Sequence, residues 1–335
     1  MNAVLRRASL VHLGVTVTLL LAGFPTCSSA QTQEKSIRLG LIEYGNSELS
    51  RNNMRLLLEG LREHGYVEGK NLLFERRHAE GQGERMPAIA DELIALKLDA
   101  IVTTCTPSTR LMYSRTHSVP LIMAAVSDPV GQKLIASLAR PGGNITGLAS
   151  QFEDIAGKML ALFREAVPRT SHVAVLFNET NPVHTIFLRE IQAAALPIDV
   201  RLSPVAISAK TDIAATADEM VARGVNGVLA LPDDPMLTNR RRLIVEMATK
   251  RGLPSFFGMA EAVDDGGLMS YGENFGKTYF RAAHYVDKVL KGASPAELPV
   301  EQPTRFELVV NQKTARSLGL VLPRSILLRA DRVID

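Results

Sequence analysis

The fold is decided by the stretch SIRLGLIEYGNSELSRNNMRLLLEGLREHG, residues 36–65, in which a short aliphatic run precedes a segment of helical periodicity. The run at 36–42 predicts a β-strand, because aliphatic and β-branched residues favour strands. One apolar helix face follows at the spacing i, i+3, i+4 and i+7, formed by Met54, Leu57, Leu58 and Leu61. Gly65 marks the end of this helix. A strand that leads into such a helix is typical of a parallel sheet with crossover helices.

The same unit recurs through the rest of the chain. In the first half, strands are expected near 71–76, 100–103 and 121–125, with helices through 86–93 and after Pro107. In the second half, strands are expected near 173–177, 199–205 and 227–231, and helices at 155–166, 184–195, 212–223, 237–250 and 275–291. The repetition predicts an α/β fold whose two halves share one architecture.

The composition is that of an ordinary folded protein. Of 335 residues, 46% are hydrophobic and 22% are charged, which excludes a disordered chain and a collagen. This length suggests about two domains. The first thirty residues hold Arg6 and Arg7 and no acid, so the remaining 305 carry 36 basic and 35 acidic residues. Such a balanced charge does not suit a protein that binds phosphate backbones, and no nucleic-acid partner is expected.

The first thirty residues have the layout of a secretory signal peptide. Arg6 and Arg7 precede an uncharged, mostly apolar run at 8–24, and small residues at 28–30 favour cleavage after Ala30. A periplasmic location is therefore expected. Cys105 is the one cysteine that remains after such cleavage, so no intramolecular disulfide is expected.

Three alternatives stay open for this segment. An uncleaved membrane anchor is one, although a run of 17 residues is short of the roughly 20 that span a bilayer. Lipoprotein processing at Cys27 is disfavoured by Phe24 and Pro25. The paired arginines also resemble a twin-arginine export signal, although Ser9 stands where that pattern prefers Phe.

The usual signatures of catalysis and cofactor binding are missing. The sequence has no phosphate-binding loop, no H-E-x-x-H zinc motif and no G-x-S-x-G nucleophile motif. Gly81 and Gly83 resemble the start of a dinucleotide loop, but Met86 occupies the position of the third glycine. The histidines after residue 30 show no close pairing of the kind that metal sites favour. No cofactor, metal or catalytic residue is therefore expected.

Polar loops that follow the predicted strands are the candidate binding site. Four of them join a capping residue to a proline, which predicts helix starts at Thr106-Pro107, Asp128-Pro129, Asn181-Pro182 and Asp234-Pro235. In open α/β sheets ligands bind at the carboxyl ends of the strands, where these loops lie. The candidate ligand-binding residues are Tyr44, Thr104, Thr106, Ser127, Asp128, Asn178, Asn181, Asp233 and Tyr271.

A structural role is the alternative for most of these residues. Thr106, Asp128, Asn181 and Asp234 can instead cap helices, and Tyr44 and Tyr271 can instead pack in the core. Asp233 is not needed as a cap if Asp234 is one. It is therefore the strongest single candidate.

Several motifs resemble the ABC transporter substrate-binding family over essentially the whole chain after residue 30. They are GLREHGYVEG at 60–69, SDPVG at 127–131, SLARPGGNITG at 137–147, GGLMSYG at 266–272 and LPVEQPTRFELVVN at 298–311. The resemblance implies a type I periplasmic binding protein with two Rossmann-like lobes and mainly parallel sheets. Three hinge crossings would fall near 147–151, 271–275 and 302–306. The first lobe would then comprise 31–147 plus 272–302, and the second 148–271 plus 303–335.

The resemblance implies a function in solute uptake. The protein would capture a small polar solute by closure of its lobes and deliver it to an ABC permease with its ATPase subunit, without catalysis. A monomer is expected, because the sequence leaves no long apolar stripe over after folding. Some members take up amino acids, including aromatic ones. The loops at 43–46 and 178–181 depart from common members, and both would line the cleft.

For an amino-acid ligand, the expected arrangement places the carboxylate on the helix start at 104–106. The ammonium would lie near Asp233 or Asp128, and Tyr44 and Tyr271 would pack the side chain. Two other functions stay open: a binding module for a membrane sensor kinase, and a hydrolase or racemase. The enzyme would need paired acids, for which the candidates are Asp233 with Asp234 and Asp264 with Asp265.

Overall fold

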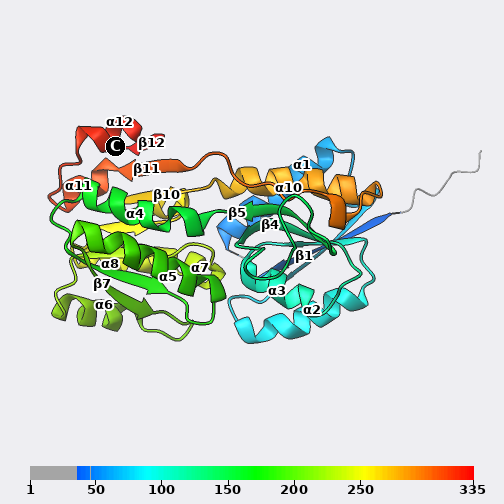
Figure 1. Ribbon diagram of the computed structural model, residues 1–335, viewed down its shortest axis with the longest axis horizontal. Coiled ribbons are helices and arrows are strands. Elements are labelled where there is room, and N and C mark those ends of the chain that lie inside the picture. Colours follow the sequence, from blue (N-terminus) through cyan, green and yellow to red (C-terminus); the bar gives the residue numbers. More distant parts are fainter. Residues whose placement is uncertain (1–35, 46) are drawn as a thin grey trace, which may run out of the picture. The chain divides into compact units, whose positions relative to one another are not determined.

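The computed structural model describes residues 36–45 and 47–335. The predicted signal peptide at 1–30 lies outside the described residues. Within them, no helix is long and apolar enough to cross a membrane. Two sheets organise the described chain, and the predicted α/β fold with mainly parallel strands is confirmed (Figure 1).

The first sheet has the strand order β2-β1-β3-β4-β5 and is parallel throughout. Its strands are β1 (Ile37–Glu43), β2 (Leu72–His78), β3 (Ala100–Thr103), β4 (Leu121–Ser127) and β5 (Ile145–Ser150). Helices cover both of its faces, which is why β3 and β4 consist entirely of buried residues. The covering helices are α1 (Glu48–Glu63), α2 (Met86–Ala95), α3 (Thr106–Tyr113) and α10 (Phe275–Leu290), with short 3₁₀ turns η1 (Gly83–Arg85) and η3 (Pro295–Glu297).

The second sheet has the order β12-β11-β10-β9-β8-β6-β7, and β10 and β11 are its antiparallel pair. Its strands are β6 (His172–Phe177), β7 (Arg201–Ala206), β8 (Gly227–Ala230), β9 (Ser255–Phe257), β10 (Met269–Gly272), β11 (Glu307–Asn311) and β12 (Arg332–Ile334). Its helices are α4 (Phe152–Ala166), α5 (Pro182–Ala195), α6 (Ile213–Ala222), α7 (Pro235–Asn239), α8 (Arg241–Lys250), α9 (Ala260–Asp264), α11 (Gln312–Ser317) and α12 (Arg324–Arg329), with the 3₁₀ turn η2 (Leu196–Ile198).

Alternating side chains of β6 divide the core of the second sheet into two layers. Val173 and Val175 pack in the cluster that contains α4 and α5, whereas Ala174 and Leu176 pack in the cluster that contains α6 and α8. This is the period of two that a strand buried on both faces requires. We call each sheet with the helices packed on it a lobe, the first lobe and the second lobe.

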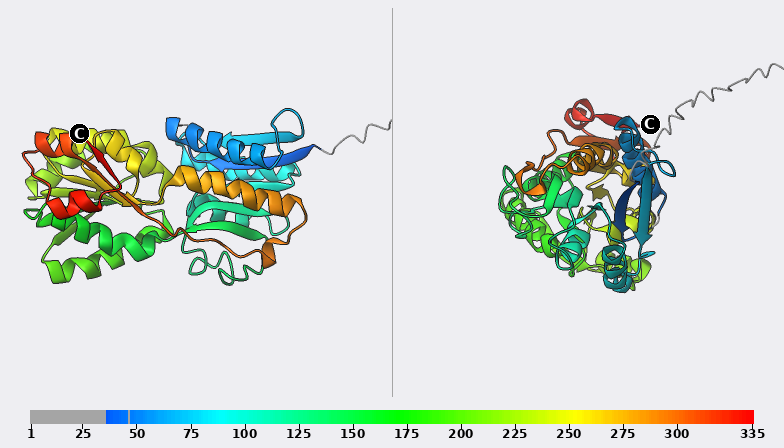
Figure 2. Two further views of the ribbon diagram at one scale, coloured as in Figure 1. Left: turned by 90° about the horizontal axis from the view of Figure 1, so that it is seen from above. Right: turned by 90° about the vertical axis from the view of Figure 1, so that its right-hand side faces the viewer.

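The described chain passes between the lobes after β5, after β10 and before β11. Helix α10 follows β10 of the second sheet yet packs beside α1 on the first sheet, as two views show (Figure 2). Leu148 of β5 forms a β-bridge with Glu301, and the Ser150 hydroxyl donates a hydrogen bond to Glu273. The lobe boundary at residue 147 stays a prediction; strand β5 continues in the first sheet to Ser150.

Two predicted helix starts and one predicted helix differ from the sequence-based expectation. No helix begins at Asp128-Pro129, because Asp128 has a left-handed φ of 46° and its carboxylate instead accepts from the Gly131 N–H. Thr106 lies inside α3, and Cys105 occupies the N-cap position. The helix expected at 237–250 is divided into α7 and α8, which meet at Arg240.

The close approach of α1 and α10 depends on Gly60. A Cβ added there would lie 2.6 Å from the Phe280 carbonyl oxygen. Alanine is the better helix former by about 1 kcal/mol. We nevertheless expect Gly60→Ala to lower stability, because overpacking a core typically costs about 1–3 kcal/mol. Thermal unfolding followed by circular dichroism tests this. Gly143→Ala is the matched control, since nothing lies within 4 Å of its Cβ position; a higher midpoint for Gly60→Ala would contradict the prediction.

Candidate functional site

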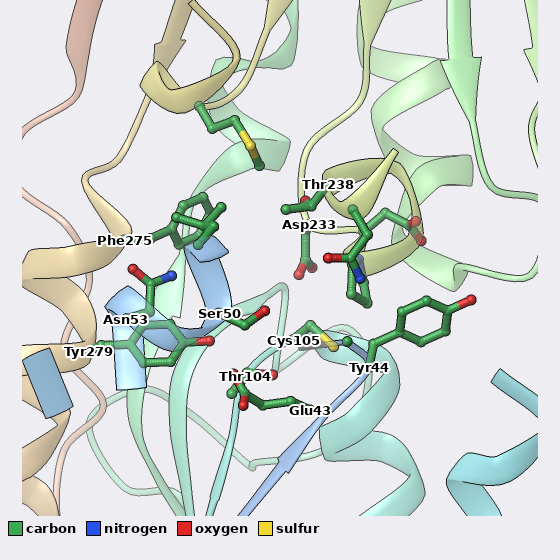
Figure 3. Close-up of a pocket in the computed structure, with 16 residues that line it drawn as sticks. Glu43, Tyr44, Ser50, Asn53, Thr104, Cys105, Asp233, Thr238, Phe275 and Tyr279 are labelled. Carbon is green, nitrogen blue, oxygen red and sulfur yellow. The ribbon is translucent and has the colours of Figure 1, made fainter. Parts of the chain in front are cut away.

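A pocket of about 80 Å³ lies between the two lobes, at the carboxyl ends of β1, β3 and β8 (Figure 3). The first lobe contributes the loops after β1 and β3, part of α1 and part of α10, and the second lobe contributes the loop after β8 and α7. We call it the Asp233 pocket. It is lined by Glu43, Tyr44, Gly45, Leu49, Ser50, Asn53, Thr104, Cys105, Asp233, Asp234, Pro235, Thr238, Asn239, Met259, Phe275 and Tyr279.

Asp233 is a buried charged group by which the second lobe contacts the first. Its backbone has a left-handed φ of 56°, and its carboxylate is directed toward the first lobe (Figure 3). The Thr106 hydroxyl donates to Asp233 Oδ2 at 2.7 Å, and the Ser127 N–H donates to the same hydroxyl at 3.1 Å. Burial raises the pKa of Asp233 to about 7, despite the opposing effect of these hydrogen bonds. Asp233 is thus a buried acidic side chain at the junction of the lobes, and a nearby cation would stabilise its ionised form.

Asp234, its neighbour, has a structural role. Its oxygens accept hydrogen bonds from Asn178 Nδ2 at 2.9 Å, Asn181 Nδ2 at 3.2 Å and the Leu237 N–H at 2.9 Å. The last of these caps α7. Asn181 caps α5 through its own side-chain oxygen. The two asparagines therefore hold Asp234 in place in the pocket wall.

Glu43 supplies a second acid to the pocket at the end of β1. It pairs with Arg76 of β2, whose Nε lies 2.6 Å from Glu43 Oε2. Burial raises the pKa of Glu43 to about 7, and Arg76 only partly offsets that effect. Tyr279 of α10 is also buried, which, together with the Glu43 charge, raises its pKa well above the ordinary value. Glu43 therefore adds to the acidic character of the pocket, although Arg76 neutralises part of it.

Asn53 is a functional candidate that the sequence analysis missed. The residue is only 6% exposed, and its Oδ1 atom has no hydrogen-bond partner. The carboxamide projects into the pocket beside Phe275 and Tyr279 (Figure 3). A buried amide without a partner is costly unless a ligand or water completes it. In the sequence, Asn53 could have been recognised as a polar residue on the apolar face of the helix, four residues after Leu49 and four before Leu57.

The sequence-predicted residues fall into three groups. Tyr44, Thr104 and Asp233 line the Asp233 pocket. Four residues contact the pocket residues from behind. Thr106 donates to Asp233, and the Ser127 N–H donates to Thr106. Asn178 and Asn181 donate to Asp234. Asp128 and Tyr271 lie elsewhere. All nine assignments as ligand-binding residues stay predictions.

Asp128 and Tyr271 do not line the pocket, contrary to the arrangement expected for an amino-acid ligand. Asp128 lines a different surface depression with Arg189 of α5, because the turn after β4 carries it away from the β3 and β8 loops. Tyr271 lies within β10 and packs into the core of the second lobe. Its hydroxyl accepts from Lys158 Nζ at 2.6 Å, and its ring centroid lies 5.8 Å from that of Phe306.

A second cavity of about 430 Å³ adjoins the first. We call it the Met236 pocket. It shares Tyr44, Cys105, Asp234 and Pro235 with the Asp233 pocket. Its apolar lining comes from both lobes and includes Met86, Pro107, Leu111, Pro235 and Met236. The cleft between the lobes thus has a small acidic part and a larger, mostly apolar part.

The other acid pair considered for catalysis is held in ion pairs. Asp264 contacts Arg332 at 2.5 Å, and Asp265 contacts both Arg241 and Arg242 at 2.8 Å. Neither acid lines the Asp233 pocket. In the part of the chain that the structure describes, no group of three or more His, Cys, Asp or Glu side chains could hold a metal ion.

Comparisons with known proteins identify the family and agree with the fold. A family model described as ABC transporter substrate binding protein matches residues 50–334. A tyrosine-binding protein from Clostridioides difficile strain R20291 is 26% identical over 263 residues, which are 78% of this chain and 75% of that protein. Two solved structures are each 25% identical and cover 89% of this chain and 100% of theirs. They are a conserved domain protein from Vibrio cholerae O1 biovar eltor, with a TM-score of 0.83, and the ABC domain in complex with L-Trp from Streptococcus pneumoniae, with a TM-score of 0.82.

Asp233 should make stability depend on pH. Folding raises the pKa of this carboxyl from 3.8 to about 7, so the folded state favours the protonated form. The resulting stability is fully present below pH 3.8 and is lost as the pH rises through about 7. Asn cannot ionise, so the variant does not lose this stability. We expect the free energy of unfolding of Asp233→Asn to rise relative to that of the wild type by up to about 4 kcal/mol between pH 4 and pH 8. Thermal midpoints of ligand-free protein across this range measure the gain. Asp91→Asn, at an exposed ion pair, is the control. A difference between Asp233→Asn and wild type that is constant with pH would contradict the prediction.

Proposed function

The chain belongs to the ABC transporter substrate binding protein family, and from this premise we propose that its Asp233 pocket captures a free amino acid for uptake. As a member of that family, the protein binds a small-molecule solute and works with an ABC permease. The proposal concerns the chemical class of the solute and the residues that hold it. It also includes export under the direction of residues 1–30 and action as a monomer that does not alter its ligand.

The charge of the Asp233 pocket carries the proposal. Glu43, Asp233 and Asp234 are among its lining residues, and no Lys, Arg or His is. Arg76 compensates Glu43 from outside the pocket, and amides and a backbone N–H engage Asp234. Asp233 has only neutral hydrogen-bond donors. An ammonium group placed beside it would neutralise a desolvated carboxylate, which is the arrangement that makes buried ion pairs effective in recognition.

Neutral polar groups supply the complementary half of an amino-acid site. Ser50, Thr104, Thr238 and Asn239 line the same pocket, and each can donate a hydrogen bond to a carboxylate. Helix α3 begins at Thr106, two residues after Thr104, and its first N–H is directed at the Asp233 carboxylate. Asn53 has a buried carboxamide oxygen that an ammonium could satisfy. A zwitterion would therefore find partners for both of its charges.

The relatives support this choice of ligand. One is named for tyrosine, and one was solved in complex with L-Trp, each at about one quarter sequence identity to this chain. Both names concern aromatic amino acids. The acidic pocket and these names point independently to the same class of solute.

Lobe closure is the proposed means of capture. Thr106 and Asp233 join the lobes through a buried hydrogen bond, and Arg242 of α8 contacts Glu48 of α1 at 3.2 Å. A ligand that contacts both lobes favours the form in which they meet, and the permease would recognise that form. The buried bond contributes more to closure than the exposed pair, because water and salt screen the exposed pair.

The proposal predicts selective stabilisation by amino acids. The purified protein is unfolded and refolded to remove any bound ligand, and thermal shifts are then measured against amino acids, short peptides, organic acids and sugars. A ligand at 100 times its dissociation constant adds about 2.7 kcal/mol, so the shift is readily measured. Chromatography of the recovered compound checks that it is unchanged. A response confined to sugars or organic acids, or conversion of the amino acid, would refute the proposal.

Asp233→Ala should weaken amino-acid binding by well over tenfold in isothermal titration, because the bound ammonium loses its charged partner. Asp128→Ala is the matched control. It removes a carboxylate that the sequence also offered for the ammonium but that lies outside the Asp233 pocket. Its affinity should equal that of the wild type. Equal losses in the two variants would remove Asp233 from the ammonium site.

A further inference from the structure

The Asp233 pocket has room for only part of a large amino acid. A cavity needs about 10–15 Å³ for each water-sized group, so its volume of about 80 Å³ accommodates roughly five to eight such groups. The ammonium, the α-carbon and the carboxylate of an amino acid are already five non-hydrogen atoms. A side chain larger than a few atoms must therefore extend beyond this pocket.

The Met236 pocket is the space into which such a side chain can extend. The two cavities share four lining residues, so they are adjacent parts of one cleft. The volume of the second is about 430 Å³, several times that of the first. Three further cavities, which are lined by residues such as Arg281, Arg189 and Arg242, share no lining residue with the Asp233 pocket.

The lining of the Met236 pocket suits an apolar or aromatic group. Met86 of α2 and Met236 of α7 are 8% and 4% exposed, so each is a core methionine that also forms part of a cavity wall. Leu111 of α3 adds a third aliphatic side chain. Methionine is flexible and polarisable, and its sulfur makes favourable contacts with aromatic rings. Because Met86 and Leu111 belong to the first lobe and Met236 to the second, a group held here would also contact both lobes.

Tyr44 lies at the boundary of the two cavities and lines both. Its side chain points away from Glu43 and the centre of the Asp233 pocket (Figure 3). On the other side, its ring is close to Gly83, where an added Cβ would lie 3.4 Å from Tyr44 Cε2. The ring therefore forms part of the wall of the Met236 pocket, and an apolar group that extended from one cavity to the other would lie beside it.

We propose that the Met236 pocket receives the side chain of the bound amino acid and that Tyr44, Met86, Leu111 and Met236 select large apolar side chains. This proposal rests on the proposed function, because the ligand's head group must occupy the Asp233 pocket. The continuity of the two cavities and the apolar lining of the larger one carry it. The specificity of the protein is thus assigned to a region separate from the acid that holds the ammonium.

Wild-type protein should discriminate by side-chain size. Isothermal titration with L-tyrosine, L-tryptophan and L-leucine should give affinities at least tenfold higher than titration with glycine or L-alanine. Two ligands that differ by one methylene group in an apolar pocket already differ in affinity by about tenfold or more. Equal or tighter binding of glycine and L-alanine would overturn the proposal and leave the proposed function standing. Failure of every amino acid to bind would overturn both.

Ala209→Trp tests the location of the side chain directly. Ala209 is an exposed loop residue that lines the Met236 pocket, so an indole there would occupy the cavity without entering the core. The affinity ratio of L-tyrosine to L-alanine should fall at least tenfold. Ala222→Trp is the matched control, because Ala222 is exposed at the end of α6 and lines neither pocket. It should leave both affinities unchanged.

Leu111→Ala gives a second test that does not add bulk. It removes apolar contacts from the cavity wall and should lower the same ratio by several-fold. An unchanged ratio in both Ala209→Trp and Leu111→Ala would overturn the proposal. Binding of two amino acids per protein would also overturn it, because the second cavity would then hold an independent ligand.

Discussion

The packing of α10 against α1 is the constraint on which the rest of the structure depends. Helix α10 follows the second sheet in sequence but packs on the first, so the chain must cross between the lobes before and after it. The contact is close because residue 60 is glycine. It places Phe275 and Tyr279 beside Asn53, although the two helices are more than two hundred positions apart in sequence (Figure 3). One helix pair thus fixes both the connection between the lobes and one wall of the site.

The site combines an acidic pocket with an adjoining, mostly apolar cavity, and both lobes line each of them. Carboxylates and amides gather where β1, β3 and β8 end, and aliphatic side chains of α2, α3 and α7 gather around the adjoining cavity. Burial makes an uncompensated carboxylate unfavourable, so a cation bound beside Asp233 would be stabilising. It also makes aliphatic walls effective for an apolar group. Charge and size can then be selected separately, which suits a binding protein that must recognise one class of solute.

The sequence was informative wherever one short segment carried the signal. Strand β3 lies at the residues expected from the sequence. The loops after β1 and β3 share one edge of the first sheet because parallel strands end there, and the loop after β8 of the second sheet faces them across the cleft. Asp233 could be singled out because Asp234 accounts for the cap of α7. Asn53 and Tyr279 could not be found in the same way, since they lie within helices and meet only through the packing of α1 with α10.

Tyr271 and Asp128 were misplaced for reasons that depend on three-dimensional contacts. Residues of a strand alternate between the two faces of the sheet, and the face that Tyr271 occupies is decided by its contacts with Lys158 and Phe306. The proline after Asp128 suggested a helix, but the Gly131 N–H satisfies that carboxylate within a turn. Both outcomes depend on a partner that the local sequence does not identify.

Cys105 has a kinetic consequence that follows from its position in the shared wall of the two cavities. Its thiol is buried, donates a hydrogen bond to Ser108, and has its pKa raised to about 12 by burial. The thiolate is the reactive form of cysteine, so this sulfur reacts slowly with alkylating reagents. Because Cys105 lines both cavities, a ligand that spans them would shield the thiol further.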